Sequence, residues 1–220
     1  APPAVQWQRN LGGSQSDIAN SVAQTADGGY VICGTTFSNN GDVSGNHGQA
    51  DIWVLKLDEA GDIQWQRCLG GTGFDTGTAV FQRPDGSYLV IGTTSSNSGD
   101  VSGNHGSSDI WLAKLDASGT LIWQRCYVGS LADVAWDMMA TQDGGCIITG
   151  ESYSSDGDLT TNAGAGDYWI VKLETDGEIE WHRSYGGSGG DGAMRVALTS
   201  DGGYIVNGFT ESNNGDVSGF

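Results

Sequence analysis

A polar loop that recurs along the chain carries the side chains best suited to binding a metal. Its pattern is S-N-N-G-D-V-S-G-N-H-G-x-x-D, which is rich in carboxylate and amide oxygens. Calcium takes about 6–8 such oxygens, including the backbone carbonyls that glycine-rich loops expose. The predicted calcium ligands are Asp42, Asn46, Asp51, Asp100, Asn104, Asp109, Asp158, Asn162 and Asp167. The alternative is that Asn and Asp fold the loop by hydrogen bonding to its own backbone.

A second candidate site consists of residues that break the sequence repeat described below. Trp136, Asp137 and Arg195 lie on the segments that we expect to form the innermost strands. They combine an aromatic surface, a carboxylate and a guanidinium, a set of groups that suits a small ligand such as a glycan. The alternative is a structural one, in which Asp137 and Arg195 form an ion pair across a channel and Trp136 packs in the core.

Motifs of known catalytic centres are absent from the chain. It contains no G-x-S-x-G nucleophile elbow and no H-E-x-x-H metalloprotease pair. Asp137 is nearly alone as an unrepeated acid on a predicted inner strand, whereas a second such acid would favour a polysaccharide-active enzyme. We therefore expect no enzymatic activity and no cofactor other than calcium.

The elements that position these residues follow from an internal repeat of 58 residues. Trp7, Trp65, Trp123 and Trp181 are spaced by 58 positions, and each begins a W-Q/H-R triplet. An aspartate set and a D-G turn keep the same spacing without any insertion. Such self-similarity predicts a repeat architecture. The predicted single domain, 1–220, consists of repeats 1–58, 59–116, 117–174 and 175–220.

Each repeat is expected to contain four β-strands. In the first repeat the expected strands are Ala19–Gln24, Gly29–Thr36, Asp51–Leu57 and Ile63–Arg67. The D-G-G turn between the first two, followed by β-branched and aromatic residues, is typical of a hairpin. The middle strands are almost continuously apolar, as expected when both faces of a sheet are covered. These features predict an all-β fold of four-stranded antiparallel blades, a β-propeller or part of a larger one. A β-solenoid is the main alternative.

Composition excludes several classes of partner. The net charge is −18, from 27 acidic and 9 basic residues, so the chain repels nucleic-acid phosphates and anionic membrane surfaces. No apolar run approaches the roughly 18 residues of a membrane helix. The four cysteines occupy no common repeat position and are expected to be buried free thiols.

The two ends of the chain do not match the repeat. The last repeat lacks the counterpart of His47–Asp58, which contains the third strand, and Val5–Arg9 is expected to be a fourth strand with no blade before it. We expect either that more sequence follows Phe220 or that another chain fills the gap. Self-assembly through the incomplete last blade is one such arrangement.

The repeat resembles those of bacterial secreted β-propellers. The string GGxxxDxAxxVxxTxDGGYxVxGxT followed by DIWVxKLDxxGxIxWQR is similar to the seven-bladed β-propeller repeat family and its relatives in bacterial surface proteins. The resemblance implies a secreted or cell-surface setting, a binding or adhesion role, and glycans or surface proteins as partners. The alternatives are a structural repeat of a stalk or filament and, third, a polysaccharide-active enzyme domain.

Overall fold

The computed structural model describes residues 4–159 and 161–218, and its regular secondary structure consists of fourteen β-strands. Three sheets have four antiparallel strands each, and the fourth has two. The strands are β1 Asp17–Gln24, β2 Tyr30–Thr36, β3 Asp51–Leu57, β4 Ile63–Leu69, β5 Asp75–Gln82, β6 Tyr88–Thr94, β7 Asp109–Leu115, β8 Leu121–Tyr127, β9 Asp133–Ala140, β10 Cys146–Ser152, β11 Asp167–Leu173, β12 Ile179–Tyr185, β13 Asp191–Leu198 and β14 Tyr204–Thr210. In the described residues no helix is long and apolar enough to cross a membrane.

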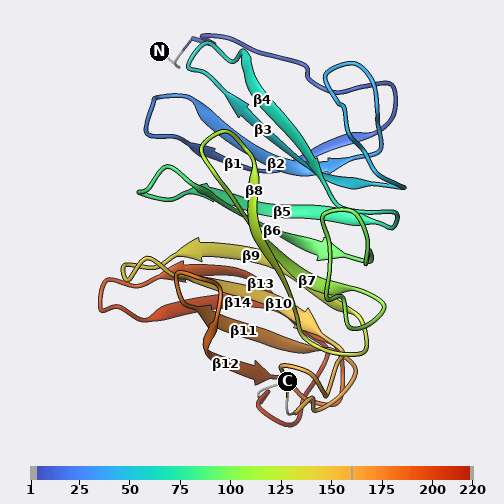
Figure 1. Cartoon of the computed structure of the whole chain (residues 1–220). Coiled ribbons are helices and arrows are strands. Elements are labelled where there is room, and N and C mark those ends of the chain that lie inside the picture. The colour runs from blue at the N-terminus through green and yellow to red at the C-terminus, as the bar shows by residue number, and fades with distance from the viewer. Residues whose placement is uncertain (1–3, 160, 219–220) are drawn as a thin grey trace.

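The four sheets are successive blades of an open β-propeller. Within each complete blade the strands pair in sequence order, and the first strands β1, β5, β9 and β13 contact one another from blade to blade. The sheets lie one upon another from the N-terminal blade to the C-terminal pair (Figure 1). The predicted all-β fold with four-stranded antiparallel blades and an incomplete last blade is confirmed.

Most of the core lies between blades, and one smaller cluster lies within the first blade. One cluster joins Ile52 and Val54 of β3 to Trp111 and Ala113 of β7, and a second joins Leu112 of β7 to the following blade. The third strand of the first blade is buried along its whole length. The second blade covers one of its faces, and Leu11 and Val43 pack with Trp53 and Leu55 on the other. This agrees with the expectation from its continuous apolar sequence.

A repeated aspartate fixes the start of each blade. Asp17 accepts hydrogen bonds from the hydroxyls of Thr36 and Ser38 and from the backbone N–H of Gly13 (2.7 Å). The equivalent residues Asp75, Asp133 and Asp191 make the same set of bonds. Three of its acceptor sites are therefore used within the blade, which explains why this aspartate recurs in every repeat.

The predicted strand Val5–Arg9 is wrong as secondary structure, because the segment pairs with no other strand among residues 4–159 and 161–218. The segment nevertheless lies where a fourth strand of a preceding blade would lie. The Trp7 ring contacts Gly61 of the first blade and meets Tyr30 edge-on at 5.7 Å. In the same way Trp65 of β4 contacts Gly119 and meets Tyr88 at 5.5 Å.

Candidate functional site

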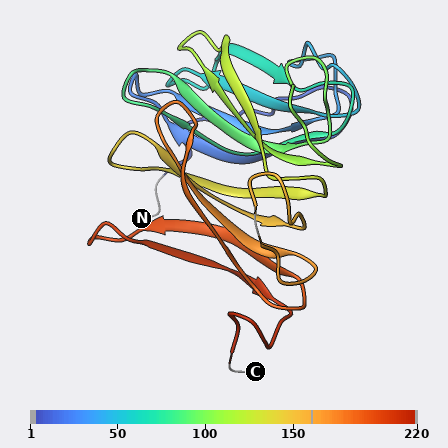
Figure 2. The same cartoon turned by 60° about the horizontal axis from the view of Figure 1, so that its bottom comes forward.

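The fourth sheet ends at an uncovered strand, β14. Its residues alternate between half-buried and exposed, whereas the equivalent strand β10 is buried throughout because β11 covers it. Ile205 is 62 % exposed. Figure 2 shows β13 and β14 at the end of the stack, with one edge free. Unpaired N–H and C=O groups at a sheet edge are ready to pair with another strand.

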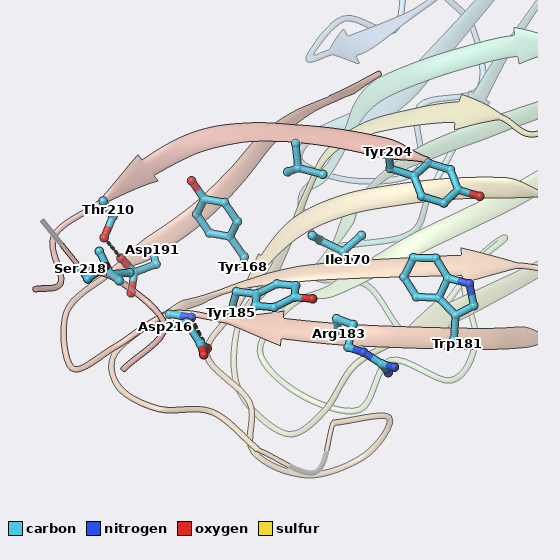
Figure 3. Close-up of a pocket in the computed structure, with 13 residues that line it drawn as sticks. Tyr168, Ile170, Trp181, Arg183, Tyr185, Asp191, Tyr204, Thr210, Asp216 and Ser218 are labelled. Atoms are coloured by element: carbon cyan, nitrogen blue, oxygen red, sulfur yellow. Dashed lines mark hydrogen bonds between the residues drawn. The ribbon is translucent and has the colours of Figure 1, made fainter. Parts of the chain in front are cut away.

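A groove runs beside this edge and has a volume of about 630 Å³. Its floor is formed by Ile170 of β11 and by β12, and its wall by Tyr204 and Val206 of β14. The side chains of Tyr168, Tyr185, Trp181 and Arg183 lie around it (Figure 3). We call it the edge groove. It combines apolar and aromatic surface with a few polar groups, as binding sites commonly do.

The edge groove lies where a complete blade holds its third and fourth strands. In complete blades a lysine on the third strand pairs with the aspartate of the D-G turn: Lys56 with Asp27 (2.9 Å), Lys114 with Asp85 (3.5 Å) and Lys172 with Asp143 (2.8 Å). Asp201 is the equivalent aspartate of the fourth blade. It accepts hydrogen bonds from the Thr199 hydroxyl and from Gly203 N–H (3.2 Å), but no lysine reaches it among the described residues.

Two residues of β12 also lack the contacts that their equivalents make. Arg9 donates to Ala60 and Asp62, Arg67 to the Ser118 carbonyl (3.0 Å) and Arg125 to Glu178 (2.6 Å), all in the turn between the third and fourth strands of the following blade. Within the described chain Arg183 donates only to the carbonyl of its neighbour His182. Trp181 packs against Tyr204 at 5.9 Å, with no turn glycine beneath its ring.

The loop after β14 has the same conformation as the corresponding loops of the complete blades. Asp216 accepts a hydrogen bond from the backbone N–H of Gly186 at 3.4 Å. The equivalent residues Asp42, Asp100 and Asp158 accept the same bond at 3.0, 3.3 and 2.8 Å. Because this loop has the conformation found in complete blades, the entrance to the edge groove is preorganised.

The residues predicted to bind calcium are hydrogen-bonded to backbone groups in and around their loop. Asp42 accepts from Gly12 N–H, while Asn46 donates to the carbonyls of Thr36 and Ser38. Asp51 accepts from the N–H of His47 and lies 2.7 Å from its ring nitrogen. The bonds of Asn46 and Asp51 are of the kind that the turn alternative predicts, whereas Asp42 bonds to the segment before β1. In the second and third loops Asn104 and Asn162 bond similarly to Asn46. In the described part of the chain no three His, Cys, Asp or Glu side chains are grouped to hold a metal.

A buried carboxylate oxygen at each blade junction is nevertheless unpaired. Asp51, Asp109 and Asp167 are almost completely buried, and their Oδ1 atoms have no hydrogen-bond partner. Burial raises the pKa of Asp51 and of Asp109. Oδ1 of Asp51 and Oδ2 of Asp75 lie on the same side of Gly70, within 3.0 and 2.5 Å of the position that a β-carbon there would occupy. The blade junctions thus bring pairs of carboxylates together.

The residues of the predicted ligand site do come together on the inner strands. Trp136 is the unpaired, bulged residue of β9, between Ala135 and Asp137 in the register with β10. The first strand of every blade has a bulge at this position. Bulges are common where a strand re-aims a side chain. Arg195 donates to the Trp136 carbonyl at 3.4 Å.

The carboxylate of Asp137 is engaged by the backbone. It accepts from Met138 N–H (2.9 Å) and from Val196 N–H of β13 (3.1 Å), and no ion pair joins it to Arg195. Ser21 makes the same link between the first and second blades, accepting from Val80 N–H at 3.3 Å. Asp137 therefore joins neighbouring inner strands, and Arg195 is the exposed member of the group.

Other repeated charges form ion pairs within and between blades. The lysines form ion pairs with the turn aspartates, and two of the arginines pair with acids in the next blade. All four cysteines are free, and burial raises the pKa of Cys68 and Cys126 to about 12. Sequence reasoning located the missing third strand but not the edge groove, whose signal was the unmatched Trp181, Arg183 and Asp201.

Comparisons with known proteins leave the family open. No family model matches the chain. It is 25% identical over 190 residues to the regulatory protein FlaEY of Caulobacter vibrioides, a match that covers 80% of this chain and 20% of that protein. The chain therefore spans about a fifth of the length of this curated relative.

Two solved structures are similar at low identity. One is a GH43_12 protein retrieved from the capybara gut metagenome, with a TM-score of 0.44, 13% identity, and coverage of 78% of this chain and 30% of the other. The second is an ACO/RPE65 chimera, with a TM-score of 0.39, 16% identity, and coverage of 78% and 40%. The likeness to the GH43_12 protein stands against our expectation that the chain is not an enzyme, and that expectation is withdrawn.

Proposed function

We propose that the chain is a propeller repeat module with a binding role, and that an extended polypeptide segment binds in the edge groove. The free edge of β14 beside the apolar groove carries this proposal. Addition of a strand to an exposed sheet edge is a common mode of peptide recognition, in which main-chain hydrogen bonds give affinity and side-chain pockets give specificity.

The adhesion role and the secreted or cell-surface setting predicted from the sequence belong to the same proposal. An acidic, strand-rich repeat suits a module displayed outside the cell, where it binds surface proteins or copies of related repeats. Carbohydrate is the second candidate ligand, because Tyr168, Tyr185 and Trp181 present aromatic rings in the groove next to the Arg183 guanidinium.

The test probes the labelled chain against an array of extended peptides and an array of polysaccharides. Val206 lines the groove, whereas Ile205, the next residue of β14, is exposed and does not line it. We expect peptide binding that is lost in Val206→Arg and retained in Ile205→Arg, which is the matched control. If a polysaccharide binds and Val206→Arg abolishes that binding, the ligand is a glycan and not a polypeptide. If Val206→Arg leaves all binding unchanged, the groove is not the binding site.

A further inference from the structure

Two equivalent cavities lie at the junctions between complete blades, one lined by His47 and Cys68 and the other by His105 and Cys126. The first has a volume of about 560 Å³ and lies between the first and second blades. The second has a volume of about 450 Å³ and lies between the second and third blades. Each therefore combines a histidine of the polar loop with a cysteine of the fourth strand. We call them the junction cavities.

The histidine and the cysteine are present together or absent together. In the first two repeats they stand at equivalent positions, 58 residues apart. In the third repeat the same two positions hold Ala163 and Ser184. The third blade forms the same four strands without either side chain, so the fold does not require them. A pair that occurs in two repeats and is lost as a pair in the third indicates that the two groups act jointly.

A buried aspartate determines which ring nitrogen of the histidine is free. Nδ1 of His47 lies 2.7 Å from Oδ2 of Asp51, and Nδ1 of His105 lies 2.8 Å from Oδ2 of Asp109. The aspartate side chains are fully buried, whereas the imidazoles are 39 and 50 % exposed. Because an ionised carboxylate only accepts hydrogen bonds, Nδ1 carries the hydrogen and Nε2 keeps its lone pair. Carboxylates orient the histidine ligands of metal sites in this way.

We propose that each junction cavity binds a soft monovalent cation of the Cu⁺ class, held between the histidine Nε2 and the cysteine sulfur. Soft thiolate sulfur favours Cu⁺, and imidazole is also a ligand for copper. Zinc sites use three or four protein ligands, whereas Cu⁺ is satisfied by two ligands in a line. The choice agrees with the finding that no three His, Cys, Asp or Glu side chains are grouped for a metal among residues 4–159 and 161–218.

The charges around the first junction cavity favour a cation. Asp100 lines it, and the buried Oδ1 of Asp51 has no hydrogen-bond partner among the described residues. Burial, followed by the negative charge of Asp51, raises the pKa of Cys68 to about 12. The same negative charges attract a metal cation, which takes the place of the thiol proton when it binds. Arg67 also lines the cavity, but its guanidinium donates to two backbone carbonyls.

The test measures the Cu⁺ bound per chain in competition with a chromogenic chelator, without oxygen and with a reductant that contains no thiol. We expect the native chain to bind two cations and to show the ultraviolet absorption of a copper–thiolate bond. The double variant His47→Ala/Cys68→Ser should bind one cation, and the same pair of changes at the second cavity should have the same effect. Cys146 is a buried free thiol that lines neither cavity, so Cys146→Ala is the control that keeps both sites.

A variant that gains a site separates loss of a ligand from loss of the fold. The N–H of Ala163 donates to Oδ2 of Asp167 at 2.7 Å, as the N–H of His47 donates to Asp51. The change Ala163→His would therefore place an imidazole beside the same kind of carboxylate. We expect Ala163→His/Ser184→Cys to bind a third cation, and Ser184→Cys alone to bind no more than the native chain.

Circular dichroism establishes that each variant is folded before its copper content is compared. A folded native chain that takes no Cu⁺ from the chelator refutes the proposal. Binding of two cations that persists after both histidine–cysteine pairs are removed refutes the assignment to the junction cavities. If Ser184→Cys alone gains a full site, the thiol binds without its histidine and the pairing is refuted.

Discussion

Trp169 and His182 lie on neighbouring strands of the third blade, and neither the indole Nε1 nor the imidazole Nδ1 has a hydrogen-bond partner. In the first blade the equivalent indole of Trp53 donates to Gln66 at 2.9 Å. In the second, Trp111 donates to Gln124 at 2.5 Å. The exchange of glutamine for histidine therefore removes a hydrogen bond that two other blades contain.

Replacing His182 by glutamine should restore this bond. We expect His182→Gln to raise the free energy of unfolding by about 0.5–1.5 kcal/mol, the net value of an ordinary hydrogen bond. Urea denaturation at constant pH measures it as a shift in midpoint. The reciprocal change Gln124→His should destabilise the chain by a similar amount. If both changes leave the midpoint where it is, the pair contributes nothing to stability.

Replacing Asp109 by asparagine should flatten the dependence of stability on pH. Burial raises the pKa of Asp109, so the folded chain binds its proton more tightly than the unfolded chain. The free energy of unfolding therefore falls as the pH rises from the ordinary pKa of aspartate, which applies to the unfolded chain, through the raised pKa of Asp109 in the folded chain. Asp109→Asn removes this loss, and we expect it to stabilise the chain at neutral pH more than at pH 4.

Denaturant titrations of both proteins across this pH range give the comparison. Asp85 acts in the opposite direction, because the Ser87 hydroxyl, the Ser87 N–H and Lys114 lower its pKa to about 2. Its contribution is present above the ordinary aspartate pKa and is lost on acidification. Only the difference between wild type and variant is diagnostic, and an equal stabilisation at both pH values would show that Asp109 is not the titrating group.

Calcium provides a direct test of the polar loops. We expect the unfolding temperature to be the same in millimolar calcium and in chelator, because Asp42 is already hydrogen-bonded to Gly12 N–H and Asn46 to the carbonyls of Thr36 and Ser38. Differential scanning calorimetry measures it. A rise with calcium that Asp42→Asn abolishes would instead confirm the metal site predicted from the sequence.

Replacing a fourth-strand tryptophan by alanine should cost more stability where a turn of the following blade covers its ring than where no such turn is present in the described residues. Trp65 packs on Gly119 and Tyr88, and we expect Trp65→Ala to cost about 3 kcal/mol, the lower end for aromatic truncation because the ring is partly exposed. Trp181→Ala should cost clearly less, since no turn covers that ring. If thermal or urea unfolding shows that both variants lose the same free energy of unfolding, the turn contributes nothing to stability through the tryptophan.

The inner-strand group tests the glycan prediction. Arg195 is exposed and can be removed at little cost in stability, whereas Asp137→Ala leaves the Val196 N–H without its acceptor. Asp137→Asn, which keeps an acceptor oxygen, is the matched control for that loss. Polysaccharide binding that disappears in Arg195→Ala, with an unchanged melting temperature, is the outcome that the sequence-based hypothesis predicts.

The strands and the blade architecture were predictable because the repeat fixes their spacing and their apolar patterns are continuous. The expected range Asp51–Leu57 is the observed β3, and the other expected strands are displaced by only a few residues. Val5–Arg9 failed because a strand requires a pairing neighbour, which sequence pattern alone does not supply. The inner-strand bulge at Trp136 could not be predicted from the sequence either, because it is visible only in the register between β9 and β10.

The docking of each tryptophan on the following blade has a consequence for synthesis of the chain. Trp65 leaves the ribosome long before Gly119, so a blade whose fourth strand is complete still exposes its indole until the next turn emerges. Chains fold progressively from the N-terminus as they are made. We therefore expect the nascent protein to grow as a stack whose last blade is always unfinished, with one uncovered tryptophan and one unpaired arginine marking its advancing end.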